Sequence, residues 1–434
     1  MARVSVRETP RPRSGGMDAG HNRLHMLNRI WAFFFFAAFF VGLVKWLALG
    51  DAEVFPAMVQ STFDMAGVGF EIALGLTGVM CLWLGVMRLG EAGGAVDLLA
   101  RLFRPLMRRL FPGIPPGHPA TGAIVMNMAA NMLGLDNAAT PLGLKAMKEL
   151  QTLNPEKERA SDDQILFLVI NTSAVTLIPI TIFVYRAQLG AADPTDVFIP
   201  LLVATFCSTM VGLVVTALVQ RIRLWDPVVL AYLGGMTALV AGMVLYFASL
   251  PRDVMERQST VLSNVLIFTV IIAFLALAAR RRAPVYETFV EGAKEGFQVA
   301  VQIIPFLVAM LVAIGVFRAS GTLDLILDGV RYWVQRAGLD SRWVDGLPTA
   351  LMRPLSGSGA RGLMLETMET LGADSFAGRL VSIIQGSTET TFYVLAVYFG
   401  SVGIKDTRHA APCGLAADLG GILGAIFVAY LFFG

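Results

Sequence analysis

A cluster of polar side chains interrupts an apolar segment near the end of the chain. Residues 380–400 are long and apolar enough to cross a bilayer, but the stretch GSTETTFYVLAV (386–397) places a carboxylate, Glu389, inside them. A carboxylate near the middle of a membrane span costs about 2.5–3.5 kcal/mol on insertion scales, so it is usually kept where it faces a cavity or a partner. Glu389 is therefore either a ligand for a solute or coupling ion, or the structural partner of Arg353 or Arg361.

A second polar cluster lies about 214 residues earlier, in NTSAVTLIPITIFV (171–184). Aligning Asn171 with Gln385 places Ser173 on Ser387 and Thr176 on Thr390. The Thr and Ser hydroxyl groups of residues 171–176 could instead bond to carbonyl groups of their own helix. The matching positions nevertheless favour one shared site, formed by two membrane-embedded segments.

The composition indicates a membrane protein. Of the 434 residues, 56% are hydrophobic and 15% are charged, whereas soluble domains contain about 25% charged residues. The three cysteines lie far apart in apolar segments and are expected to be core residues. The four histidines have no metal-ligand spacing. We expect no metal, no cofactor and no nucleic-acid partner.

Several apolar runs approach the roughly 20 residues that a transmembrane helix needs. They predict spans at about 28–49, 70–89, 164–186, 197–219, 228–249, 261–279, 298–317, 379–400 and 411–433. Basic or mixed amphipathic segments at 96–113 and 323–337 are predicted to lie in the membrane interface. Shorter amphipathic pieces are expected at 55–65 and 284–297. The predicted fold is an all-α polytopic membrane protein.

Two further segments read as broken helices. Residues 119–134 are apolar but too short to cross, and they lead through LDNAATP (135–141) into a second short helix. The segment 347–371 contains RPLSGSGARG (353–362) at the corresponding place. Such re-entrant hairpins are tolerated at membrane depth only where they are buried or line a cavity. An ordinary pair of surface helices is the alternative.

The two halves of the sequence correspond. Gly69-Phe70-Glu71 matches Gly296-Phe297-Gln298, and GLKAMKEL (143–150) matches MLETMETL (364–371). Lysine and arginine in the short loops place the N-terminus in the cytoplasm. The single extra span at 228–249 then inverts the second half relative to the first, as in many secondary transporters. The predicted division is a disordered basic tail (1–27), a first repeat (28–225), a linking span and loop (226–260) and a second repeat (261–434).

The hairpin tips and the two polar clusters are expected to meet at one site. Its candidate solute ligands are Asn131, Asp136, Asn137, Thr140, Ser173, Thr176, Ser356, Ser358, Arg361, Gln385, Ser387, Glu389 and Thr390. Helix N-termini at the second tip would direct free N–H groups at an anionic or strongly polar group. The candidates for binding a coupling ion, H⁺ or Na⁺, are Glu389, Asp136 and Asp418.

At these residues the chain resembles a fusion of spore maturation proteins A and B. The first half carries NMAANMLGLDNAATPLGLKAM and NTSAVTLIP, which resemble protein A, and the second carries RPLSGSGARG and GSTETTFYVLAVYFG, which resemble protein B. Both halves resemble the nucleoside-recognition Gate domain, which also occurs in concentrative nucleoside transporters. The resemblance implies a transporter-like fold with hairpins and leaves the substrate undefined.

These observations predict a secondary transporter or gated permease of a bacterial inner membrane. It would move a small polar solute, neutral or anionic, and no enzymatic activity is expected. A homo-oligomer is an open alternative to a single copy. The alternative functions are an intramembrane enzyme acting on a lipid-linked substrate, and a membrane regulator or scaffold that transports nothing.

Overall fold

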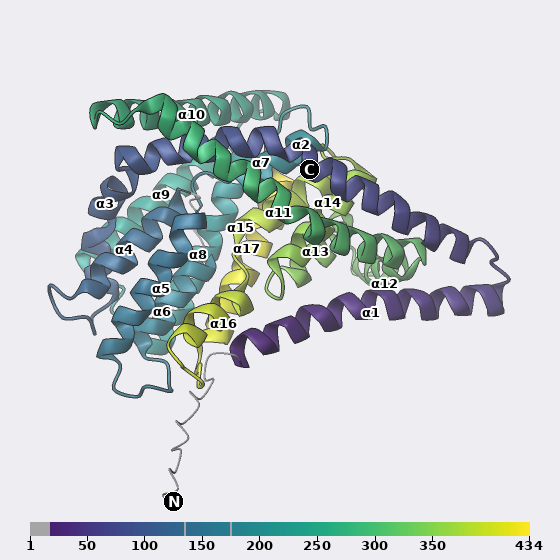
Figure 1. Cartoon of the computed structure of the whole chain (residues 1–434), viewed down its shortest axis with the longest axis horizontal. Helices are drawn as coiled ribbons and strands as arrows, with labels where there is room; N and C mark the ends of the chain where they lie inside the picture. Colours follow the sequence, from purple (N-terminus) through teal and green to yellow (C-terminus); the bar gives the residue numbers. More distant parts are fainter. Residues whose placement is uncertain (1–17, 134–135, 174–175) are drawn as a thin grey trace, which may run out of the picture.

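The computed structural model describes the backbone of residues 18–133, 136–173 and 176–434. It describes the side chains of residues 29–133, 139–173, 176–251, 254–255 and 257–434. Helices account for 81% of the described residues, which form no strand beyond a single bridge between Arg159 and Asp406. Seven described helices are long and apolar enough to cross a membrane. The prediction of an all-α, multi-pass membrane protein is confirmed (Figure 1).

Two successions of helices follow the same order. The first comprises α2 (Val54–Gly93), α3 (Ala95–Leu110), α4 (Pro119–Met132), α5 (Asp136–Leu153), α6 (Asp162–Ser173), α7 (Ile180–Gln188) and α8 (Phe198–Gln220). The second comprises α11 (Val285–Ala319), α12 (Thr322–Arg336), the 3₁₀ turn η1 (Arg342–Gly346), α13 (Leu347–Met352), α14 (Gly357–Leu371), α15 (Phe376–Ser387), α16 (Thr391–Ser401) and α17 (Ala410–Phe433). In each, a long helix and an amphipathic helix precede four short helices and a final long one.

The first long helices of the two successions, α2 and α11, pack along each other. Gly69 of α2 lies against Val308, and Gly292 of α11 lies against the carbonyl oxygen of Leu84. From the first contact to the second, the residue number rises along α2 and falls along α11, so the two helices are antiparallel. A Cβ at Gly292 would collide with the Leu84 carbonyl, so a larger residue there would force the helices apart. Small residues at such crossings are typical of membrane helix pairs.

The last long helices, α8 and α17, form a second antiparallel pair. Gly212 lies against Ala417, whereas Gly424 lies against Ala204. The Ser208 hydroxyl donates a hydrogen bond of 2.9 Å to the Ala417 carbonyl, so the contact includes a polar interaction between the two helices. Corresponding long helices of the two successions are therefore neighbours that run in opposite directions.

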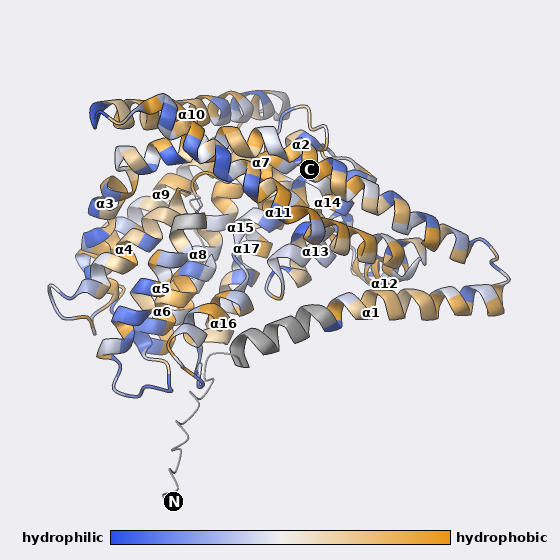
Figure 2. Ribbon diagram, in the orientation of Figure 1, coloured by the Kyte–Doolittle hydropathy of each residue, from blue (hydrophilic) through white to orange (hydrophobic). Residues whose placement is uncertain are grey.

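The remaining helices α1 (Asp18–Leu49), α9 (Pro227–Ala248) and α10 (Arg252–Arg280) lie outside the two successions. α10 runs along α2, and α1 packs on α11 through a hydrogen bond from Trp31 Nε1 to the Ala309 carbonyl (2.9 Å). The faces of α1 and α10 that point away from the protein are apolar, with Phe36 and Phe268 strongly exposed (Figure 2). This is the pattern of helices that face lipid.

Two predicted spans, 164–186 and 379–400, are not continuous helices. The first is divided into α6 and α7, and the second into α15 and α16, with residues 388–390 outside any helix. Pro179 has no N–H to donate and disfavours helix in the residue before it. The free backbone groups find partners elsewhere: Leu177 N donates to the Met132 carbonyl (2.8 Å), and Glu389 N donates to the Thr172 carbonyl (2.7 Å).

Two other predicted boundaries are absent. The amphipathic piece 55–65 and the span 70–89 form the single helix α2, and 284–297 and 298–317 form the single helix α11. No proline or glycine pair breaks α2, and Pro305 within α11 does not end it. α2 and α11 pack against each other along most of their length. Each helix therefore continues through the point where its hydrophobic pattern changes.

Candidate functional site

A cavity of about 670 Å³ lies between the two successions. The segments that line it are the tips of both broken hairpins and the interruptions between α6 and α7 and between α15 and α16. Its polar lining residues are Asn131, Thr140, Asn171, Thr176, Thr181, Arg353, Ser356, Ser358, Arg361, Gln385, Glu389 and Thr390. Three tyrosines, Tyr185, Tyr393 and Tyr398, complete it. Apolar residues such as Ile180 and Phe306 also line the cavity, so residues far apart in sequence form one site of mixed polar and apolar character.

Amide side chains join the first hairpin to α6. Asn127 Nδ2 donates to the Ala139 carbonyl (2.7 Å), which ties α4 to the returning helix α5. Asn131 Nδ2 donates to Asn171 Oδ1 (2.8 Å), and Asn171 Nδ2 donates to the Phe167 carbonyl (2.8 Å). Asn127 and Asn171 are almost fully buried, so these bonds hold the first tip against the end of α6.

Arg353 joins the second hairpin to the interruption between α15 and α16. Its Nη2 donates to the Thr388 carbonyl and its Nη1 donates to Thr390 Oγ1 (3.2 Å). The backbone adds a bond from Phe392 N to the Pro354 carbonyl (3.1 Å). The guanidinium presents several donors in a fixed plane, which suits a turn with exposed acceptors. Arg353 thereby fixes the shape of residues 388–390.

Glu389 lies at the cavity, beside this arginine. Its carboxylate is 3.6 Å from Arg353 Nη2, and its side chain is 46% exposed, whereas that of Arg353 is 6% exposed. Nearly half of the Glu389 side-chain surface thus remains accessible to a molecule in the cavity. The geometry includes the structural pair with Arg353 and leaves Glu389 accessible as a ligand.

Arg361 supplies a second cation to the cavity. Its guanidinium lies over the ring of Tyr185, 5.6 Å from the ring centre. Arg361 belongs to α14 and Tyr185 to α7, so this cation–π contact also joins the two successions. With Arg353 and Glu389, the charged lining residues whose side chains the structure describes have a net charge of +1.

Short helices direct their N-terminal ends at the cavity. Residues at or just before the starts of α7, α14 and α16 line it: Pro179, Ser356 and Thr390. Ser356 caps α14 by accepting a hydrogen bond from Gly359 N (3.0 Å). Helix N-termini carry partial positive charge and free N–H groups, so they stabilise anions and polar groups. Two independent features of the described lining, its arginines and its helix N-termini, therefore favour an anionic group.

Nine predicted site residues line the cavity: Asn131, Thr140, Thr176, Ser356, Ser358, Arg361, Gln385, Glu389 and Thr390. Ser173 and Ser387 do not; they donate to the Ile170 and Ile384 carbonyls of their own helices (3.0 Å each). Asp418 is buried behind the cavity and accepts a hydrogen bond from Thr391. The side chains of Asp136 and Asn137 lie outside the described residues.

Some lining residues were not among the predicted ligands. Asn171 could have been included, because it aligns with Gln385 in the repeat. The sequence predicts Arg353 only as a partner of Glu389, although Arg353 is the first residue of the Gly-rich segment that contains Ser356. The tyrosines carried no signal, because an aromatic residue in an apolar span is ordinary core in most membrane helices.

The segments that line the cavity lie within the residues that match a known family. A family model described as "Nucleoside recognition", the Gate model, matches residues 73–190 and 300–405, together more than half of the chain. The chain belongs to the nucleoside-recognition Gate family. The two matched ranges run from α2 to α7 and from α11 to the loop after α16, so each contains one hairpin and one interrupted span of the Gate protein.

Two relatives of this Gate protein match different parts of the chain. Spore maturation protein B of Bacillus subtilis (strain 168) is 47% identical over 173 residues, which cover 40% of this chain and 96% of the relative. Spore maturation protein A of the same organism is 38% identical over 190 residues, which cover 44% of this chain and 93% of the relative. The arrangement is that of a fusion, as the sequence indicated. No solved structure matches the chain.

Proposed function

We propose that this Gate protein is a secondary transporter or gated permease for a small anionic solute. The observation that carries the proposal is the cavity: both successions contribute a hairpin tip and an interrupted span to one polar, electropositive site. A site of about 670 Å³ has room for a small metabolite. Broken helices that aim their ends at a solute are typical of transporters.

The proposal includes an inverted repeat. The corresponding helices α2 and α11 are antiparallel, and so are α8 and α17. A two-fold axis between two copies of one module, lying in the membrane plane, requires both of these relations. Alternating access follows in such folds when one copy rocks against the other around a fixed site. The interrupted segments, which meet at the Glu389–Thr172 backbone bond, lie at the centre of that site.

An anionic solute is favoured over a neutral one by charge. Arg353 and Arg361 face the same cavity, and three helix N-termini add to their field. Glu389 would bind a cationic group of the solute or a coupling cation. Gln385, Asn131 and Thr140 would bind neutral polar groups, which would give selectivity among anions of similar size.

Uptake into proteoliposomes tests this proposal. The purified chain would first be screened by thermal shift against small carboxylates, phosphorylated compounds, nucleosides and amino acids, and the stabilising compounds would then be used as radiolabelled solutes. Because a hydrogen bond to a charged group contributes about 1.5–3 kcal/mol, Arg361→Gln should lower the apparent affinity about tenfold to a hundredfold.

Arg342→Gln is the matched control for this experiment. Arg342 is an exposed arginine paired with Asp340 in the loop before η1, and it does not line the cavity. Its replacement should leave uptake unchanged. Uptake by Arg361→Gln and Glu389→Gln at the level of the unmodified protein would contradict the assigned site.

A further inference from the structure

Outside the solute cavity, hydroxyl groups lie around Asp418, in the middle of α17. The side chain is 1% exposed and does not line the cavity. Oδ2 accepts a hydrogen bond from Thr391 Oγ1 (2.6 Å), but Oδ1 has no hydrogen-bond partner among the described residues. An ionised carboxylate with an unpaired oxygen is costly in a membrane protein interior. Such a group is expected to be protonated or to bind a cation.

Thr388 supplies the missing partner. Its hydroxyl interacts with the Asp418 carboxylate, yet it forms no well-oriented hydrogen bond with any described residue. It is 1% exposed, so water does not satisfy it on the protein surface. A proton on Asp418 Oδ1 would turn that oxygen into a donor and Thr388 Oγ1 into its acceptor. A single proton would therefore pair the two atoms and also remove the buried negative charge, which a hydrogen bond from the Thr388 hydroxyl alone would leave in place.

We propose that Asp418 binds a proton on Oδ1 and donates it to Thr388 Oγ1, which makes it the proton-binding site of the transporter. This inference rests on the proposed transport function. Sodium is the less favoured occupant, because one carboxylate and neighbouring hydroxyls provide few negative charges for a cation. The cluster is packed tightly: a Cβ at Gly421 would approach Thr388 Cγ2 to 2.5 Å and Ser387 Oγ to 3.2 Å.

The charged groups near this site belong to the solute cavity. Arg353 of the α13 tip and Glu389 of the interruption both act electrostatically on Asp418. Among the side chains that the structure describes, the packed helices carry these other titratable residues: Cys207 on α8, Cys413, His409 and Tyr430 on or beside α17, Asp162 and Asp163 at the start of α6, Arg379 on α15, Tyr393 and Tyr398 on α16, and Arg257 and Arg280 near the ends of α10. Arg353 is thus the cation that a deprotonated Asp418 would attract.

This arrangement couples the proton to the solute site. Thr388 and Thr391, which contact Asp418, flank the interruption that Arg353 holds from the cavity side. With the proton bound, Arg353 is left to bind residues 388–390 and Glu389. When Asp418 has lost its proton, Asp418 and Glu389 compete for the guanidinium of Arg353. The hydrogen bonds from Arg353 to the Thr388 carbonyl and to Thr390 then weaken. Proton release would therefore reshape the wall of the cavity.

Infrared difference spectroscopy of the purified full chain at neutral pH tests the protonation state. The difference between the unmodified protein and Asp418→Asn should contain the C=O stretch of a protonated carboxylic acid. Glu366→Gln is the control, because Glu366 is a similarly buried carboxylate that accepts a hydrogen bond from Arg318 (2.9 Å) and should lose carboxylate bands instead. A difference for Asp418→Asn that contains only carboxylate bands would overturn the proposal.

Thermal unfolding distinguishes the proton from sodium. Asparagine has the shape of the neutral acid and can donate to Thr388, so Asp418→Asn should unfold near the temperature of the unmodified protein, whereas Thr388→Val should unfold several degrees lower. Sodium chloride and choline chloride should have equal effects. A sodium-specific stabilisation that Asp418→Asn abolishes would overturn the proton assignment. Neither measurement needs a transported solute, so both stand if the transport proposal fails.

Discussion

Carboxylates at partly or fully buried positions have very different surroundings in this protein. Glu389 faces a cavity, Glu366 accepts a hydrogen bond from Arg318, and Asp418 contacts hydroxyl groups. Among the described residues, no cation offsets the burial of Asp163, which lies at the loop-side end of α6 before its apolar part. Burial and the neighbouring Asp162 raise the pKa of Asp163 to about 6, and only a backbone hydrogen bond from Gly113 opposes this shift.

The raised pKa of Asp163 predicts a pH-dependent loss of stability. The native state binds this proton more tightly than the unfolded chain does, so its contribution is complete below the ordinary pKa of 3.8 and is lost as the pH rises through about 6. At pH 8, Asp163→Asn should therefore be more stable than the unmodified protein, by up to about 3 kcal/mol.

Unfolding followed at several pH values checks this prediction. The two proteins should have equal stability below about pH 4, where Asp163 is protonated and, like the asparagine that replaces it, carries no charge. Asp162→Asn, at the exposed neighbouring position, removes only the weaker of the two causes and should have a smaller effect. A constant difference between Asp163→Asn and the unmodified protein from pH 4 to pH 8 would contradict the assignment.

Residue chemistry was the most predictable level of the site. Intramembrane Glu389 and its polar neighbours stand out in the sequence, because polar groups are costly in lipid. Which of them face the cavity was less predictable. Ser387 and Thr390 are three residues apart, yet Ser387 bonds to its own helix and Thr390 lines the cavity, because α15 ends between them. Facing direction depends on where a helix stops, and the sequence did not show that stop.

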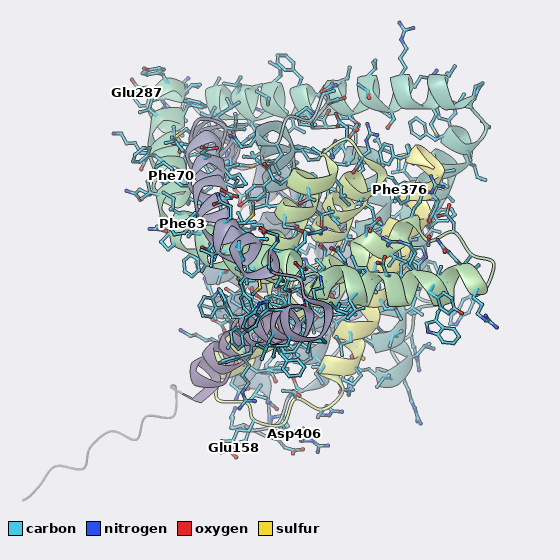
Figure 3. The ribbon with its side chains drawn as sticks, turned by 90° about the vertical axis from the view of Figure 1, so that its right-hand side faces the viewer. Phe63, Phe70, Glu158, Glu287, Phe376 and Asp406 are labelled. Carbon is cyan, nitrogen blue, oxygen red and sulfur yellow. The ribbon has the colours of Figure 1, made fainter. Side chains whose placement is uncertain are left out.

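At the scale of elements, two sets of loop contacts join the successions at opposite ends. Glu158 and Asp406 lie together at one end in Figure 3, far from Phe376 at the other. At the first end, Lys405 pairs with Glu158 (2.7 Å), with both side chains at least 70% exposed. At the second, Arg186 is fully buried and pairs with Asp196 (2.8 Å) and Asp374 (3.2 Å).

The two ends should differ in their contribution to stability. Arg186→Met would remove the fully buried cation from Asp196 and Asp374, which would still lie beside Arg379, and should cost up to about 3–5 kcal/mol. Lys405→Met removes a solvent-exposed pair and should cost less than about 1 kcal/mol. Thermal unfolding of the two variants in detergent provides the comparison. Equal losses would mean that burial of the Arg186 contacts does not hold the two successions together.

Helix existence was predictable at this scale, but helix continuity was not. Every predicted span and both hairpins correspond to helices in the structure. The interruptions in 164–186 and 379–400 were missed, because apolar flanks on both sides gave the hydropathy of a single span. Their unpaired backbone groups are satisfied by distant residues, as in the bond from Glu389 N to the Thr172 carbonyl. Such contacts are tertiary and leave no periodic signal in the sequence.

At the scale of the whole molecule, the account depends on two modules in opposite orientations. The loops that follow the second arms of the hairpins, after α5 and after α14, lie at opposite ends of the protein (Figures 1 and 3). The sequence indicated this arrangement through its repeat and its odd number of spans. It could not give the close pairing of α2 with α11, which depends on glycines such as Gly292 that only the packing explains.

Sided cysteine labelling tests the opposed orientation most directly. Lys157→Cys and Glu369→Cys place thiols at exposed positions beside these two loops, in a background with Cys81, Cys207 and Cys413 replaced by serine. In intact spheroplasts, a membrane-impermeant maleimide should label Glu369→Cys, and it should label Lys157→Cys only after the membrane is opened. Labelling of both thiols from the same side of the membrane would contradict the account.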